Sequence, residues 1–416
     1  MRLIHTSDWH LGQTLHQFER SAEHQAFLDW LAATLVTQQA DVLLISGDIF
    51  DTANPSAAAQ KQFYRFLQQA KTACPHLQIV IIAGNHDSPG RLEAPAPLME
   101  SLDATVIGFV PRLPDGGIDL NRLVIPLREA TGAIAAYCLA IPFLRPGDVP
   151  RIEDAHDPYM EGIALLYRQT LDHALSLRQP DQAIIALGHC HMIGGEVSES
   201  SERPIVIGGT EALSANIFDS AVAYAALGHL HLAQKVGKQE HLRYCGSPIP
   251  LSFAEVDYQH QVLQVDLAGD QVTTVTPLLV PRAVELLRVP RQPQALAKVL
   301  VALTALDIPQ DTAPDYMPFL EVRVLLDAPE PNLRATIEQA IEGKRVRLAK
   351  IDTHFVRQST STNNSTVLEE LEKLQPQHIF ERLYQSKYST EEKAEVPAEL
   401  TTAFAELLLG TPEVQS

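Results

Sequence analysis

The chain has 416 residues, 45% of them hydrophobic, and a formal net charge of −19. This length suits one large α/β domain with one or two smaller units, because single cores stop growing at about 250–300 residues. The acidic balance argues against a free-standing DNA-binding protein, in which Lys and Arg contacts to phosphate dominate affinity. It is compatible with a metal-dependent enzyme, since bound cations supply local positive charge, or with a subunit whose partner carries the basic surface.

The N-terminal residues lead directly into a strand-like run with no apolar signal region behind it. No stretch approaches the ~18 apolar residues that are needed to cross a bilayer, so we expect no membrane association. None of the cysteines shows CxxC spacing, and we expect reduced thiols in a cytoplasmic protein. The cysteines are Cys74, Cys138, Cys190 and Cys245.

The first part of the chain alternates strand and helix patterns. The predicted strands cover residues 2–6, 41–46 and 78–83, and the predicted helices cover residues 22–38 and 56–73. Because these strands are apolar on both faces, we expect a sheet covered by helices on each side, in a layered α/β domain over residues 1–278. Later strands are predicted at 183–187, 204–207 and 221–227. Short alternating strands between 242 and 280 fit the far edge of the same sheet.

A second, small α+β domain is predicted over residues 279–357. Its expected strands are 285–290, 319–326 and 345–351, and its expected helices are 294–306 and 332–341. Residues 358–365 form a polar stretch typical of a linker.

The tail at 366–416 has a helical period. Its apolar stripes are Leu368, Leu371 and Leu374; Ile379, Phe380, Leu383 and Tyr384; and Leu400, Phe404, Leu407 and Leu408. The stripes fit helices that dock on the catalytic domain or, after such a linker, in the groove of a partner.

Five short motifs each follow an apolar strand. They are Asp8-Trp9-His10, Gly47-Asp48, Gly84-Asn85-His86-Asp87, Gly188-His189 and Gly228-His229-Leu230-His231. In a layered α/β sheet, residues just past the carboxyl ends of strands gather at one edge, where ligands bind. The sequence therefore predicts one cluster of carboxylate, amide and imidazole groups.

This set of donors favours two divalent cations. Oxygen donors mixed with imidazoles, without thiolates, suit Mn²⁺ or Fe²⁺, and to a lesser degree Zn²⁺, better than Ca²⁺. Seven ligands are too many for one such ion, so a bridging carboxylate is expected. One ion would take Asp8, His10, Asp48 and His231, and the other would take Asp48, Asn85, His189 and His229. Ions ~3.5–4 Å apart can lower the pKa of a shared water and stabilise both oxygens of an in-line displacement at phosphorus.

Several residues within or beside these motifs could have a purely structural role. His86 is left for proton transfer to the leaving oxygen, although it could merely cap a helix. We expect Cys190 to pack away from the site and His191 to line it without binding metal. Trp9 and Phe50 are expected to be packing residues.

The ordered blocks resemble the calcineurin-like metallophosphoesterases, whose pattern is DxH…GDxxD…GNHD/E…H…GHxH. All blocks match in order over about the first 235 residues. Three segments, residues 7–12, 47–52 and 244–252, are more specifically similar to the bacterial SbcD family of nuclease subunits. By this resemblance Asp51, at a position where eukaryotic and archaeal relatives usually have histidine, orients and charges His86.

The resemblance implies an ATP-regulated, Mn²⁺-dependent exonuclease and endonuclease that processes double-strand ends and DNA hairpins in repair, recombination and replication. It also implies a complex with an SbcC-like SMC-type ATPase, bound through the C-terminal helices, and a homodimer within a heterotetramer. Residues 279–357 would be the capping domain. No basic patch identifies DNA-binding residues. Two rival hypotheses are a phosphatase of the same fold acting on small substrates and a non-catalytic scaffold that kept the ligands.

Overall fold

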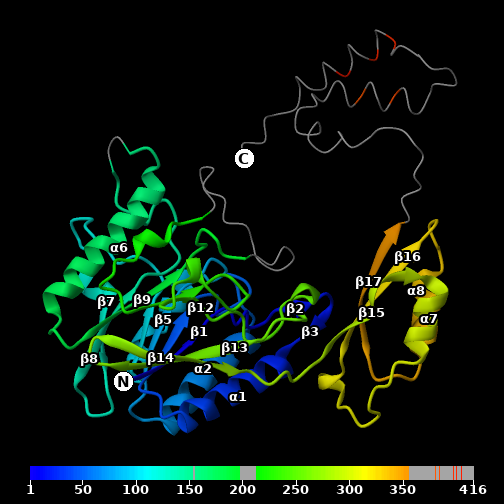
Figure 1. The fold of residues 1–416 in the computed structure, drawn as a ribbon, viewed down its shortest axis with the longest axis horizontal. Coiled ribbons are helices and arrows are strands. Elements are labelled where there is room, and N and C mark those ends of the chain that lie inside the picture. Colours follow the sequence, from blue (N-terminus) through cyan, green and yellow to red (C-terminus); the bar gives the residue numbers. More distant parts are fainter. Residues whose placement is uncertain are drawn as a thin grey trace. The chain divides into compact units, whose positions relative to one another are not determined.

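The computed structural model describes residues 1–152, 155–196 and 212–355, together with Phe380, Tyr384, Pro397, Leu400 and Phe404. The chain divides into two compact units, Met1–Phe355 and Val356–Ser416. The predicted strand at 204–207 and the linker at 358–365 lie outside the described residues. Figure 1 shows the elements of the first unit.

The first sheet has six strands in the order β14-β13-β1-β4-β5-β6. Strands β1, β4, β5 and β6 are parallel, whereas β13 is antiparallel to both β1 and β14. The strands are β1 (Arg2–Thr6), β4 (Val42–Ser46), β5 (Gln78–Ile82), β6 (Ala104–Ile107), β13 (Gln261–Ala268) and β14 (Gln271–Leu279).

The second sheet also has six strands, in the order β11-β12-β10-β9-β8-β7. Its centre is parallel, and its two outermost pairs are antiparallel. The strands are β7 (Val124–Arg128), β8 (Ile134–Ala140), β9 (Ala183–His189), β10 (Tyr224–Gly228), β11 (Gln234–Lys235) and β12 (Leu242–Tyr244).

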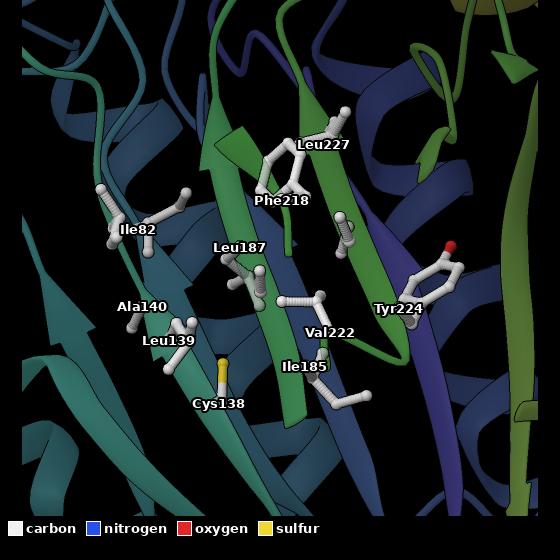
Figure 2. Packing of buried hydrophobic residues seen from close by; sticks show 14 of the residues in the cluster. Ile82, Cys138, Leu139, Ala140, Ile185, Leu187, Phe218, Val222, Tyr224 and Leu227 are labelled. Carbon is white, nitrogen blue, oxygen red and sulfur yellow. The ribbon is translucent and has the colours of Figure 1, made fainter. Parts of the chain in front are cut away.

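The predicted layered α/β fold, a sandwich of the calcineurin-like metallophosphoesterase type, is confirmed. The expectation of one sheet with helices on both faces is wrong, because the second sheet covers one face of the first. Alternate residues of β1, β4 and β5 enter different cores, as the pleat of a strand requires. Leu3, Val42, Leu44, Val80 and Ile82 join the second sheet, whereas Ile4, Leu43, Ile45, Ile79 and Ile81 join the helix-covered core. A facing sheet buries apolar side chains as fully as a helix layer does, so the sequence pattern could not distinguish the two arrangements. Figure 2 shows part of the core that the two sheets share.

Helices cover the outer faces of both sheets. Helices α1 (Ser21–Thr37) and α2 (Ala57–Ala73) pack Phe27 and Phe63 into the core of the first sheet. Helix α6 (Pro158–Leu177) begins at Asp157, whose side chain accepts from the N–H of Met160, and it packs on the second sheet. The shorter elements are β2 (Thr14–Leu15), β3 (Phe18–Glu19), α3 (Pro89–Glu93), α4 (Ala96–Glu100), α5 (Leu120–Leu123), η1 (Ala215–Ile217), η2 (Val236–Lys238) and η3 (Phe253–Glu255).

Within the first unit, residues 286–355 form a three-stranded parallel sheet in the order β15-β16-β17, and this region is called the second domain below. Its helices pack Val299 and Ile337 against Leu320 and Val322 of the central strand. The elements are β15 (Leu286–Ala295), α7 (Leu296–Thr304), η4 (Pro314–Tyr316), β16 (Phe319–Leu326), α8 (Leu333–Ala340) and β17 (Arg347–Phe355). This order follows the predicted one closely.

In the C-terminal unit, the described positions Phe380, Tyr384, Leu400 and Phe404 are helical. The rings of Phe380 and Phe404 stack with centroids 4.3 Å apart. Two of the predicted apolar stripes therefore meet at this pair. Tyr384 and Leu400 belong to the same two stripes, and the remaining stripe residues lie outside the described part of the chain.

All four cysteines are free thiols. Among the described residues, no helix has the length and apolar character to cross a membrane.

Candidate metal centre

The predicted ligands come from five strand ends, three in the first sheet and two in the second. Asp8 and His10 follow β1, Asp48 follows β4, and Asn85 follows β5; His189 ends β9, and His229 and His231 follow β10. Their side chains form overlapping clusters. Three groups of possible metal ligands among the described residues are Asp8, His10 and His231; Asp8, Asp48 and His189; and His10, Asp48 and His86.

Asp48 lies between the two predicted ligand sets. Its Oδ2 atom is 3.6 Å from Nε2 of His10 and 3.4 Å from Nε2 of His189. Its Oδ1 accepts a 2.8 Å hydrogen bond from the backbone N–H of His86. A carboxylate between imidazoles from different strands has the arrangement that a bridging ligand requires.

The remaining predicted ligands lie on either side of Asp48. On one side, the ring centroids of His10 and His231 are 5.2 Å apart. On the other, Oδ1 of Asn85 lies 2.9 Å from Nε2 of His189 and 3.1 Å from Nδ1 of His229. The structure thus brings the seven residues close to one another, although Asp8 also lies in one possible ligand group with Asp48 and His189, across the two predicted sets.

The backbone is strained where it turns these side chains inward. Asp8, His10, Asp48 and His229 have φ angles of 54°, 47°, 50° and 103°. Such conformations cost of order 1–3 kcal/mol each and cluster at functional sites. At Gly84, an added Cβ would collide with Oδ1 and the backbone of Asp48, so only glycine permits this approach.

The donor set fits divalent cations. Six of the seven predicted ligands are buried, namely Asp8, His10, Asp48, His189, His229 and His231. His10 Nε2 is also buried, and within the described ranges no hydrogen-bond partner reaches it. Buried polar atoms are nearly always satisfied, so this nitrogen is placed as a metal ligand would be. Oxygen and imidazole donors without thiolates suit first-row divalent cations such as Mn²⁺, Fe²⁺ and Zn²⁺.

The ionisable groups of the cluster shift one another's pKa values. Burial alone would raise the pKa of Asp48, but the charges of His189 and His10 outweigh it and hold that pKa well below its usual range. Burial opposes charging of His189, yet the Asp48 and Asp8 carboxylates raise the pKa of that imidazole to about 9. Burial and the charge of His189 lower the pKa of His229 well below its usual value. Asp48 is therefore held as an anion, the form that could be shared by two cations.

His86 and Asp51 lie beside the first group of ligands. The His86 ring is 4.7 Å from that of His10, and its Nδ1 is 2.7 Å from the backbone oxygen of Asp51. The Asp51 carboxylate lies 3.2 Å from Nδ1 of His10. Asp51 thus contacts His86 through its backbone, and its carboxylate supports a predicted metal ligand, a role that the sequence did not suggest.

Cys190, His191 and Trp9 lie within or beside the ligand motifs and make contacts of other kinds. Cys190 Sγ packs 3.7 Å from the sulfur of Met192, and burial raises the pKa of its thiol to about 12. His191 joins none of the potential ligand groups found among the described residues, and its ring is 6.4 Å from that of His229. Trp9 is fully buried against Phe66, as expected of a packing residue.

Two supporting carboxylates were not predicted from the sequence. Asp87 accepts from the backbone N–H groups of Gly84, Ile49 and Phe50, and so ties the loop after β5 to the loop after β4. Glu255 accepts from Nδ1 of His231 at 2.9 Å. Asp87 could have been found from its place in the Gly84–Asp87 motif. Glu255 lies 24 residues beyond His231, in a segment without a metal-ligand pattern.

Comparisons with known proteins agree with this arrangement. Residues 1–233 match the family model described as calcineurin-like phosphoesterase, and residues 282–388 match the model described as type 5 capsule protein repressor C-terminal domain. The chain is 39% identical to the SbcD subunit of the nuclease SbcCD from Rhodobacter capsulatus, over 91% of this chain and 93% of that protein. It is 34% identical to the protein of the same name from Escherichia coli, over 92% of each chain. For the Bacillus subtilis protein the identity is 36%, over 66% of this chain and 68% of that one. The chain belongs to the SbcD family of calcineurin-like phosphoesterases.

Proposed function

We propose that this chain is the nuclease subunit of an SbcCD-type complex and hydrolyses DNA phosphodiester bonds with two divalent metal ions, with Mn²⁺ as the expected metal. The observation that carries this proposal is the position of Asp48, within 3.6 Å of His10 on one side and 3.4 Å of His189 on the other. The family relationship supports a nucleic acid as the substrate, which we propose to be DNA, since the relatives are named nucleases.

Bound at the two ligand groups, the ions would supply an activated water and positive charge for an in-line displacement at phosphorus. Asp8, His10, Asp48 and His231 would hold one ion, and Asp48, Asn85, His189 and His229 would hold the other. His86 would protonate the departing 3′ oxygen. The Asp51 oxygen beside its Nδ1 fixes the ring so that Nε2 is the nitrogen available to donate.

A comparison of substrates tests this proposal. We expect the chain to cleave linear duplex or hairpin DNA in Mn²⁺ and to leave cyclic nucleotides intact. Asp8→Ala should abolish the cleavage and His86→Gln should lower its rate, while Asp115→Ala, which changes an exposed carboxylate, should do neither. Preferential hydrolysis of cyclic nucleotides would favour a small-substrate phosphatase, and unchanged cleavage by Asp8→Ala would favour a scaffold with a contaminating nuclease.

We further propose that residues 366–416 bind an SMC-type ATPase, with two copies of this chain in a heterotetramer. The support is the family relationship together with the stacked apolar pair Phe380 and Phe404. Deletion of residues 366–416 should abolish co-purification with the ATPase and preserve Mn²⁺ binding. Retained co-purification would contradict this assignment.

A further inference from the structure

The second ring nitrogen of His231 is held by a buried carboxylate. His231 Nδ1 lies 2.9 Å from Oε1 of Glu255, which has no solvent exposure. A carboxylate at this distance makes Nδ1 the protonated nitrogen and leaves the Nε2 lone pair for a metal. Such partners orient an imidazole ligand and raise its basicity.

Glu255 is itself fixed in position. Its Oε2 accepts a 2.7 Å hydrogen bond from the backbone N–H of Leu251. The backbone N–H of Ser247 donates to the carbonyl oxygen of His231 at 3.1 Å, and the Ser247 carbonyl lies 2.8 Å from Nδ1 of His260. The segment from 247 to 260 therefore holds both the backbone of His231 and its carboxylate partner.

The same turn also contacts the second domain. Phe253 and Val256, on either side of Glu255, pack in an apolar cluster with Leu286 of β15 and Phe319 of β16. The Arg282 guanidinium donates to the Val256 carbonyl oxygen at 2.9 Å. Glu255 thus faces His231, while Phe253 and Val256 face the domain that the family resemblance implies to be a cap.

The histidines of the other ligand group are supported differently. His189 Nδ1 lies 2.9 Å from the backbone oxygen of Ser46, and His229 Nδ1 lies 3.1 Å from the Asn85 side chain. Neither of these contacts involves a carboxylate. Loss of Glu255 should therefore affect the two ions unequally.

We propose that Glu255 is a positioning residue that holds His231 toward one ion, and that its turn links the affinity of this ion to the seating of the second domain. This inference rests on the proposed two-metal function. A second domain that shifts against Phe253 and Val256 would move Glu255, and with it His231. The domain would thereby influence the metal centre without contributing a ligand.

Mn²⁺ binding to Glu255→Gln, measured by calorimetry and by electron paramagnetic resonance, tests the positioning role. We expect one of two sites to weaken roughly 10–100-fold, the range for outer-shell partners, and the other to keep its affinity. The matched control is Glu321→Gln, a buried carboxylate that pairs with Arg288 and Lys350 in the second domain and should leave both sites intact. Two wild-type affinities in Glu255→Gln would overturn the proposal.

A pair of leucine variants tests the link between the domains. Leu286→Ala removes a side chain beside Phe253, whereas Leu320→Ala removes one from the interior of the second domain. We expect Leu286→Ala to weaken Mn²⁺ at the same site by roughly two- to thirty-fold and Leu320→Ala to leave it unchanged. Equal effects of the two, or none, would contradict the link.

The two proposals fail in different ways. A wild-type chain that binds no Mn²⁺ refutes the proposed function and this inference with it. A chain that binds two Mn²⁺ ions and cleaves DNA, while Glu255→Gln binds both ions normally, refutes only the inference.

Discussion

The backbone N–H of His86 donates a 2.8 Å hydrogen bond to Oδ1 of Asp48. This bond fixes the position of the proposed bridging carboxylate relative to the backbone of the proposed proton donor. The other carboxylate oxygen, Oδ2 of Asp48, faces His10 and His189. This contact links the loops after β4 and β5, which Asp87 also joins. These contacts make the centre testable by single substitutions and by chelation.

Asp48→Asn should eliminate Mn²⁺-dependent cleavage while the protein remains folded. Asparagine can still accept from the His86 N–H, but it lacks the negative charge that two cations would share. We expect the rate to fall by at least about 100-fold, the upper end of the loss for an outer-shell partner. Steady-state cleavage assays measure this, and Asp219→Asn, which changes a surface carboxylate paired with Arg168, is the control. Near-normal activity of Asp48→Asn would refute the bridging role.

His86→Gln should lower the cleavage rate and leave metal binding intact. The loss of a general acid typically costs about 10²–10⁴-fold. Because His86 lies in one potential ligand group with His10 and Asp48, the metal content decides between two roles. Two Mn²⁺ ions per chain in the variant support proton transfer, whereas loss of one ion would make His86 a ligand.

Chelation should remove the two ions in separate steps. The group of Asp8, His10, Asp48 and His231 contains two carboxylates, and Asp51 and Glu255 support its histidines. The other group shares Asp48 and otherwise has only neutral donors. We expect a titration with chelator to release first the ion beside Asn85, and Asn85→Ala to lose this step alone. A single release step for both ions would contradict the inequivalence.

Acid should destabilise the fold partly through His5. Burial lowers the pKa of this imidazole to about 3 from its ordinary value of 6.5. Below about pH 6.5 the unfolded chain binds a proton that the folded chain refuses, so the free energy of unfolding falls as the pH drops toward 3, by up to about 1.4 kcal/mol per unit. Urea unfolding of His5→Asn should show a shallower dependence, while His76→Asn, at an exposed position, should match the wild type. Identical slopes for His5→Asn and wild type would contradict the assignment.

The helices and strands that have a clear apolar pattern in their own sequence could be predicted. Strands β1, β4 and β5 and helices α1 and α2 lie within a residue or so of the expected ranges, and the order of the second domain is confirmed. Strand β8 and the 20-residue helix α6 were not predicted. β8 is rich in alanine, a poor strand former, and its place beside β9 depends on tertiary packing.

The metal ligands of the candidate site could be predicted from the sequence, but the contacts that support these ligands could not. Metal-ligand types recur at strand ends, so Asp8, Asp48 and His189 carry a visible signal. Glu255 supports His231 only because a later turn folds back onto the site, and no spacing in the sequence encodes that approach. For the same reason, the contact between the Asp51 carboxylate and His10 emerged only from the three-dimensional arrangement.

Anomalous diffraction at the manganese edge, from crystals of the full chain grown with Mn²⁺, tests the central claim most directly. We predict two peaks about 3.5–4 Å apart on either side of the Asp48 carboxylate. One peak should be bound by Asp8, His10 and His231, and the other by Asn85, His189 and His229. A single peak, or two peaks that do not share Asp48, would contradict the two-metal account.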